Sequence, residues 1–197
     1  MPTSEEIWSD VHKATALLTA MKIPYVLAGS LAGSSQGAPR TTNDADLLVA
    51  PFPGREAEFA GEFGPEYYAS LPSIIDANRR RSSFNIINTH TSFKLDFFVQ
   101  KQRPFDVSVF ARRQTRVLPE GAAQSTDILS PEDLILSKLE WYRLGGEVSD
   151  RQWKDVIEIL EANWPRLERE YLRTWAAALK VDDLLPIAIE QAGQRAQ

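Results

Sequence analysis

The 197-residue sequence predicts an α+β fold, in which a small mixed sheet is flanked by helices and followed by a helical region. Short apolar runs bounded by glycine and proline predict strands in the first part of the chain. Two runs rich in β-forming residues predict a hairpin in the middle, and the pattern after residue 127 is helical throughout. We therefore expect an α/β core over residues 1–127 and a helical region over residues 128–197.

The N-terminal segment predicts a helix followed by the first strand. Thr3 stands three residues before Glu6, which is the spacing of a capping box, and apolar residues then recur at helical intervals. Residues 25–28 (YVLA) predict a short buried strand. A Gly-Ser turn at residues 29–30 leads into a small-residue helix over residues 31–37.

The next elements alternate between strand and helix. Residues 44–49 (DADLLV) predict a second strand, which the sequence PFPG ends, and residues 55–63 predict a helix. Residues 83–89 and 93–99 are rich in β-forming residues and are separated by a polar turn. They predict the two strands of the hairpin.

The helical region begins with a strong start signal. Ser130 is expected to be an N-cap, and Pro131 suits the first helical position because its missing N–H has no partner there anyway. The helical pattern continues to the C-terminus, with breaks expected near Gly145–Gly146, Pro165 and Pro186.

Composition excludes several classes of site. The chain has no cysteine, which excludes disulfides and thiolate zinc sites, and it has only two histidines, which excludes a histidine-rich metal site. A net charge of −5 argues against nucleic-acid binding over the whole surface. The sequence shows neither a secretory signal nor an apolar run long enough for a membrane span, so we expect a cytoplasmic protein without a membrane partner.

Two carboxylates open the second predicted strand. Side chains alternate along a strand, so Asp44 and Asp46 should point to the same face. Two such groups repel each other, and each would be costly to bury alone. A divalent cation resolves this conflict, and Mg²⁺ commonly binds one or two carboxylates together with substrate phosphates. The alternative is that Asp44 caps a turn in the sequence TTND.

A third acid interrupts the second strand of the predicted hairpin. In KLDFFV, Asp96 points away from the face on which Leu95, Phe97 and Val99 are expected to be buried. If this strand neighbours the Asp44 strand, three carboxylates converge, and they could hold two metals about 3.5–4 Å apart, as in phosphoryl transfer. The alternative is an ordinary surface aspartate.

The order of these features resembles the core motif of the nucleotidyltransferase superfamily. The stretch LAGSLAGSSQGAPRTTNDADLLV, residues 27–49, contains the glycine, the following serine, the short helix and the Asp-x-Asp strand of that motif. An Arg-Thr pair before the acids is common in the branch that includes minimal nucleotidyltransferases and AbiEii-type toxins. Further along, PEDLILSKLEW resembles a helix of that branch that carries a lysine, and SDRQWKDVIEIL resembles the next helix, which carries an aspartate. The matching positions are Gly29, Ser30, Arg40, Asp44, Asp46, Asp96, Lys138 and Asp155.

The resemblance implies a polymerase-beta-like nucleotidyltransferase fold and a two-metal, Mg²⁺-dependent enzyme. By resemblance, Asp44, Asp46 and Asp96 are the catalytic metal ligands. By resemblance, the nucleoside triphosphate, which is ATP or another nucleotide, binds to Gly29, Ser30, Arg40 and Lys138. A nucleoside monophosphate would pass to an acceptor hydroxyl, and pyrophosphate would leave.

Several alternatives stay open at this point. The acceptor could be RNA, a protein or a small molecule such as an aminoglycoside. Lys138 could instead be a solvated lysine on an amphipathic helix, and Asp155 is expected to be structural. The chain could also be a non-catalytic binding or regulatory partner, such as a toxin–antitoxin component with an antitoxin partner. A third possibility is an α/β protein whose acids only cap turns.

Overall fold

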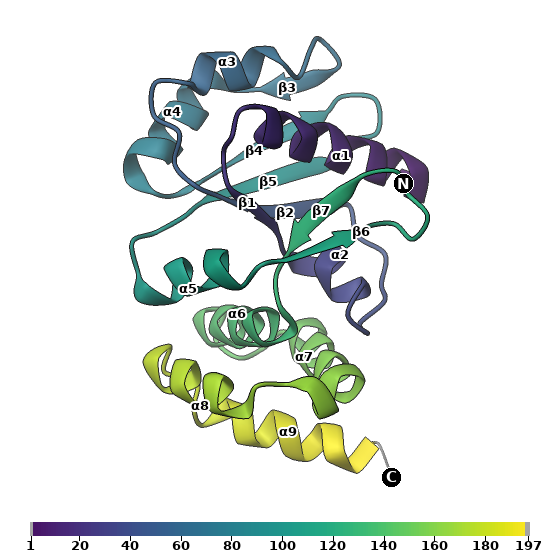
Figure 1. The fold of residues 1–197 in the computed structure, drawn as a ribbon, viewed down its shortest axis with the longest axis vertical. Coiled ribbons are helices and arrows are strands. Elements are labelled where there is room, and N and C mark those ends of the chain that lie inside the picture. The colour runs from purple at the N-terminus through teal and green to yellow at the C-terminus, as the bar shows by residue number, and fades with distance from the viewer. Residues whose placement is uncertain (1, 196–197) are drawn as a thin grey trace. The chain divides into compact units, whose positions relative to one another are not determined.

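The computed structural model describes residues 2–195 (Figure 1). These residues form two compact units. Unit 1 holds the residues up to Ala28 together with Thr41–Ile128, and unit 2 holds Gly29–Arg40 together with the residues from Leu129 onward. The segment Gly29–Arg40 thus packs with the C-terminal helices, although in the sequence it connects two strands of unit 1. The domain boundary after residue 127 stays a prediction.

Unit 1 is built on a mixed sheet whose seven strands, among the described residues, follow the order β3-β4-β5-β2-β1-β7-β6. Strands β2 and β5 are parallel neighbours in the middle of the sheet, whereas β4 and β1 run antiparallel to them on either side. The predicted strand over residues 44–49 and the predicted hairpin are confirmed. The bounds are β1 (Tyr25–Leu27), β2 (Asp44–Val49), β3 (Tyr67–Ala69), β4 (Ser83–Asn88), β5 (Lys94–Val99), β6 (Gln114–Val117) and β7 (Ser125–Ile128).

One face of this sheet is covered by an apolar core. Alternate residues of β2 and β5 are buried, and Phe97 of β5 stacks on Phe84 of β4 with ring centroids 4.8 Å apart. Phe59 of α3 (Glu56–Gly61) packs edge-to-face with Phe97, with ring centroids 5.5 Å apart, and this contact holds α3 on the same face. The remaining residues of β2 and β5, which include the three predicted acids, therefore point to the opposite face.

The helices of unit 1 begin at recognisable caps. The capping box at Thr3 is present, as predicted, and Ser70 caps α4 by accepting from the backbone N–H of Ser73. Tyr67 donates to Asp10 of α1 through its hydroxyl. Burial and this carboxylate hydrogen bond together raise the pKa of Tyr67 well above its usual value. The bounds are α1 (Ser4–Ala20), α3 (Glu56–Gly61), α4 (Leu71–Arg80) and α5 (Pro104–Arg112).

The longer helices of unit 2 pack against one another (Figure 1). Their buried apolar side chains include Leu136, Ile157 and Leu160. Ser130 caps α6 and Pro131 occupies its first turn, as predicted. Pro186 lies in the first turn of α9, where a backbone N–H would have no partner within the helix, so proline is tolerated there. The break predicted near Pro186 therefore lies just before α9. The bounds are α2 (Gly29–Ser34), α6 (Pro131–Leu144), α7 (Asp150–Asn163), η1 (Trp164–Arg166), α8 (Arg169–Ala178) and α9 (Leu184–Arg195).

The loop after α2 is fixed tightly within unit 2. Gly37 has φ +104°, and a Cβ there would lie 2.2 Å from the Cβ of Ala162, so only glycine allows this close approach to α7. The side chain of Asn163 donates to the carbonyl of Gln36 at 2.8 Å, and the Gln36 amide donates to the carbonyl of Leu129 at 2.6 Å. These contacts anchor the segment that leads to Arg40.

No helix within residues 2–195 is both long enough and apolar enough to cross a membrane.

Candidate active site

The pairing of β2 with β5 places the three predicted acids on one face of the sheet. The parallel register sets Asp46 beside Asp96 and Asp44 beside Lys94. All four side chains belong to the half-buried set of their strands, while the residues between them are buried on the other face. The carboxylates are thus on neighbouring strand positions and reachable from solvent. The sequence alone showed this arrangement only on the condition that the two strands are neighbours.

Two polar neighbours contact this row of acids. The hydroxyl of Thr42 donates to Oδ1 of Asp44. The ammonium of Lys94 lies 3.3 Å from Oδ2 of Asp96. Sequence reasoning missed Lys94, although its spacing of two residues from Asp96 in KLD already put both side chains on the same face of a strand.

The donor set suits Mg²⁺ on chemical grounds. Carboxylate oxygens are the hard ligands that Mg²⁺ takes, and a half-exposed position lets the cation keep waters or substrate oxygens in its shell. In the described part of the chain, no three or more His, Cys, Asp or Glu side chains are gathered closely enough to hold a metal ion together. Asp96 is instead paired with Lys94. The three carboxylates therefore suit the ion by the chemistry of their oxygens, and Lys94 competes for one of them.

The strand next to β2 leads directly to the glycine turn. The backbone N–H of Ala28 donates to the carbonyl of Asp46 at 2.8 Å, which extends the β1–β2 ladder by one residue. Gly29 is the next residue in the chain and has φ +59°, a left-handed conformation that suits glycine. Helix α2 begins there.

Unit 2 contains a second polar cluster, which joins three of the predicted residues to Asp155. The guanidinium of Arg40 donates to the hydroxyl of Ser30 and lies 3.4 Å from Oδ2 of Asp155. The ammonium of Lys138 lies 2.7 Å from the same oxygen. Lys138 and Asp155 are buried, with side chains 9% and 5% exposed, so Lys138 is not a solvated lysine.

This cluster carries two cations on one carboxylate. Guanidinium and ammonium groups are also the donors that suit phosphate oxygens. We call Ser30, Arg40, Lys138 and Asp155 the cation cluster.

Comparison with known proteins identifies the fold. No protein-family model and no curated protein matches the sequence. Among solved structures, an antigenic nucleotidyltransferase-like protein from Paracoccidioides brasiliensis is similar to this chain, with a TM-score of 0.59 and 18% identity over 95% of this chain and 94% of that one. The antibiotic-resistance factor ANT(2'')-Ia in solution is similar at a TM-score of 0.55, with 16% identity over 95% and 96% of the two chains.

A crystal structure of ANT(2'')-Ia in complex with adenylyl-2''-tobramycin gives a TM-score of 0.54, with 16% identity over 87% of this chain and 95% of that one. The chain has the nucleotidyltransferase fold. The fold predicted from the resemblance is therefore confirmed, and the match runs over nearly the whole length of both chains.

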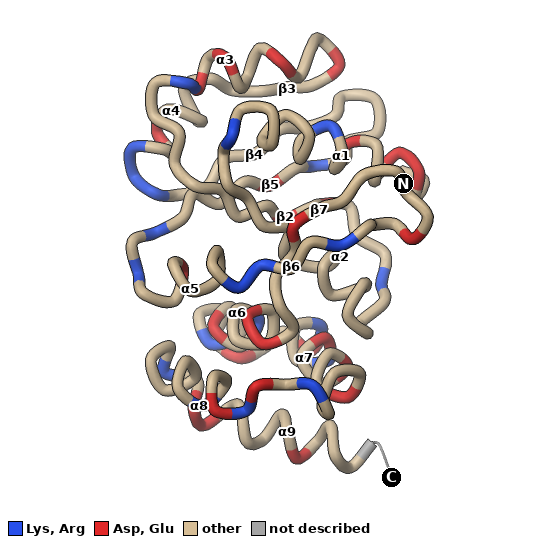
Figure 2. Tube along the Cα trace, viewed as in Figure 1, with Lys and Arg blue, Asp and Glu red and all other residues tan. Residues whose placement is uncertain are grey.

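Several arginines of unit 1 outside the set of predicted site residues form ion pairs of their own. Figure 2 shows Lys and Arg positions at the end of α4 and between β5 and α5. Arg79 and Arg80 pair with Asp76 at 2.6 and 2.9 Å, one turn earlier in α4. Arg103 pairs with Asp106 at 2.8 Å. Each of these cations is thus partly neutralised by a carboxylate three or four residues away in the chain.

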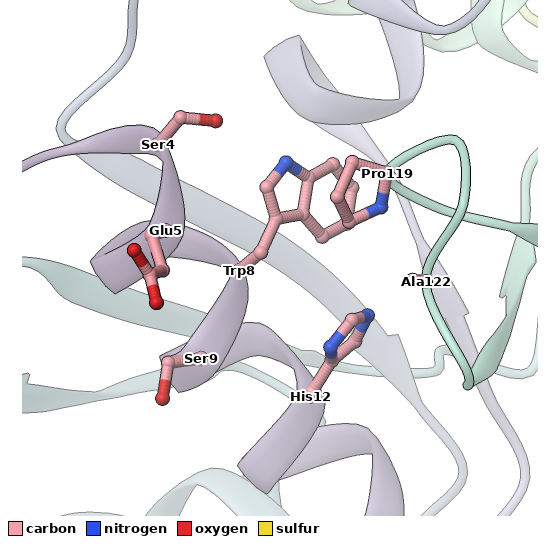
Figure 3. A pocket seen from close by; sticks show the side chains of 7 residues that line it. All are labelled: Ser4, Glu5, Trp8, Ser9, His12, Pro119 and Ala122. Atoms are coloured by element: carbon pink, nitrogen blue, oxygen red, sulfur yellow. The ribbon is translucent and has the colours of Figure 1, made fainter.

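Unit 1 also has a surface pocket whose lining includes none of the predicted site residues. It is formed by the first turns of α1 and the β6–β7 loop, with a volume of about 460 Å³ (Figure 3). His12 is fixed at its wall because its Nε2 donates to the carbonyl of Leu118 at 2.6 Å. Its lining is Ser4, Glu5, Trp8, Ser9, His12, Pro119 and Ala122.

Proposed function

We propose that this chain is a Mg²⁺-dependent nucleotidyltransferase that moves a nucleoside monophosphate from a nucleoside triphosphate to an acceptor hydroxyl. The observation that carries the proposal is the β2–β5 register, because it sets Asp46 beside Asp96 with Asp44 on the same face. Surface aspartates that only cap turns have no reason to meet on neighbouring central strands, where like charges destabilise the sheet. The nucleotidyltransferase fold supports the same reading.

In this proposal the three acids on β2 and β5 have two roles, metal binding and proton transfer. Asp44, Asp46 and Asp96 would hold the metal, and Asp96 would accept the proton of the acceptor hydroxyl at a carboxylate oxygen. The acceptor oxygen forms a bond to the α-phosphorus, and the bond from that phosphorus to the bridging oxygen breaks, so pyrophosphate leaves with the electron pair. When bound, Mg²⁺ supplies charge neutralisation at the phosphate oxygens and a template for the two reacting oxygens.

The nucleotide-binding residues would act by charge and hydrogen bonding. Arg40 offers a planar set of N–H donors and Lys138 a point charge, both of which suit phosphate oxygens. Ser30 adds a hydroxyl, and Gly29 allows the backbone to approach a ligand closely. The assignment is supported by the contacts that bring Ser30, Arg40 and Lys138 together in the cation cluster.

We propose a small-molecule hydroxyl as the first acceptor class to test. ANT(2'')-Ia was solved with an adenylylated aminoglycoside, which is a property of that protein and a guide to probes for this one. RNA and protein acceptors stay in the same panel. A role as a non-catalytic partner of an antitoxin predicts instead that no nucleotide is bound or turned over.

The test is transfer of label from nucleoside triphosphates labelled at the α-phosphorus. We expect Mg²⁺-dependent incorporation from at least one of ATP, CTP, GTP and UTP into an aminoglycoside mixture, total RNA or protein, with matching release of pyrophosphate. Removal of Mg²⁺ with a chelator should abolish both signals. Absence of metal-dependent nucleotide binding by calorimetry, together with no turnover of any of the four nucleotides, would reject the enzyme and favour the non-catalytic alternative.

A further inference from the structure

Lys94 occupies a special place on the carboxylate face. It is the first residue of β5, lies beside Asp44 in the parallel register, and pairs with Asp96 two residues later on the same strand. Its ammonium is 3.3 Å from Oδ2 of Asp96, and the two side chains are 43% and 21% exposed. A lysine thus stands among three carboxylates on the face where the metal would bind.

The position of Lys94 has an electrostatic reason. Three carboxylates on neighbouring strand positions repel one another, and this repulsion would destabilise the sheet. The hydroxyl of Thr42 stabilises Asp44 by hydrogen bonding but brings no charge. Lys94 adds a positive charge to the same face. In the metal-free protein this charge offsets the carboxylates as a bound metal ion would.

The ion pair is also one that can open. Exposed lysine–carboxylate pairs are weak because solvent screens them and because holding two flexible side chains costs entropy. The four-carbon stem of lysine lets its ammonium move several ångströms while the backbone stays in the β5 ladder. A metal ion that needs Oδ2 of Asp96 therefore competes with a partner that is easily displaced.

We propose that Lys94 is the internal counter-ion of the carboxylate face, which releases Asp96 when a metal–nucleotide complex binds and then contacts an oxygen of the bound phosphates. This inference rests on the proposed function. It makes Lys94 a positioning residue for the metal-free protein and a phosphate contact in the loaded one. It also couples the two ligands, because the nucleotide gives the displaced ammonium a new anionic partner.

The proposal predicts effects of opposite sign on two binding reactions. In Lys94→Met, Mn²⁺ alone should bind about three- to tenfold more tightly, because Asp96 is no longer occupied and a repelling charge is gone. The complex of Mg²⁺ with a nucleotide that cannot be cleaved between the α- and β-phosphates should bind about tenfold more weakly, because the ammonium–phosphate contact is lost. A purely structural lysine would weaken both or neither.

Isothermal titration calorimetry on the full chain measures both constants. Lys94→Gln serves as a second variant in case Lys94→Met does not fold, as judged by circular dichroism. Lys101→Met, an exposed lysine just beyond the same strand, is the matched control and should change neither constant. In the background of Asp96→Asn, the gain in Mn²⁺ affinity from Lys94→Met should disappear.

The outcomes separate this inference from the proposed function. If the wild-type chain binds neither Mn²⁺ nor the metal–nucleotide complex, both fail. If the wild type binds them and the Lys94 variants bind Mn²⁺ as tightly as or more weakly than wild type, the counter-ion role is overturned while the proposed function stands. Opposite shifts of the two constants, cancelled for Mn²⁺ by Asp96→Asn, support the inference.

Discussion

Replacing Asp46 with asparagine should lower nucleotidyl transfer by about a thousandfold or more, because one metal-binding charge is lost at the reacting phosphate. Asp46 stands at the centre of the row of acids, between Asp44 on its own strand and Asp96 on the next. Asparagine has nearly the same shape, so the change removes the charge and leaves the strand intact. The measurement is kcat for label transfer at saturating nucleotide and Mg²⁺.

The stability of the Asp46 variant provides the internal check. Asparagine keeps the shape of the side chain and removes one of three neighbouring like charges, so the variant should fold with a melting temperature close to that of the wild type in the absence of metal. Asp76→Asn in α4, an aspartate paired with surface arginines, is the matched control and should keep wild-type activity. Activity of Asp46→Asn within tenfold of the wild type would show that this carboxylate is not a ligand of the catalytic metal.

Replacing Asp155 with asparagine should destabilise the chain by about 3–5 kcal/mol, since it leaves a buried ammonium without its charge partner. Lys138 is 2.7 Å from Asp155, and both side chains are almost completely buried within unit 2. Arg40 loses its contact with the same oxygen but is more exposed. Urea unfolding, followed by circular dichroism at constant pH and ionic strength, measures the free energy of unfolding.

Two further variants show whether the buried charge is the cause. Asp150→Asn, an exposed aspartate at the start of the same helix, should cost less than about 1 kcal/mol. Combining Asp155→Leu with Lys138→Met removes both charges and should recover part of the lost stability. A cost for Asp155→Asn that matches the Asp150 control would mean that the pair contributes little to folding.

The central strands could be predicted closely because their residues alternate between buried and half-exposed positions. The predicted strand over residues 44–49 has the same bounds as β2, and the predicted second hairpin strand differs from β5 by one residue. The start of α6 at Ser130 and Pro131 could also be predicted, because capping depends on residues that are close together in the sequence. The parallel pairing of β2 with β5 could not be predicted, because its register depends on residues about fifty positions apart in the sequence.

The elements that sequence reasoning missed are short or weakly patterned. β6 and β7 have four residues each at one edge of the sheet, and β3 has three at the other, too few for an alternation to be recognised. Helix α4 does carry a usable signal, the Ser70 cap followed by a proline in the first turn. α5 likewise begins at Pro104.

The polar contacts of the site divide in the same way. The alternation along β5 predicts that Lys94 and Asp96 share a face, so this pair was within reach of the sequence. The cation cluster was not, because it depends on how α6, α7 and the loop after α2 pack together within unit 2. Nothing in the spacing of Arg40, Lys138 and Asp155 indicates that one carboxylate serves two cations.

The most direct measurement is an anomalous-scattering map from crystals soaked with Mn²⁺ and a nucleotide that cannot be cleaved at its α-phosphate. Manganese should appear at bonding distance from carboxylate oxygens of both Asp44 and Asp46, with Asp96 contributing to the same centre. Manganese bound elsewhere, with the carboxylates of these strands free of metal while nucleotide is present, would contradict the account.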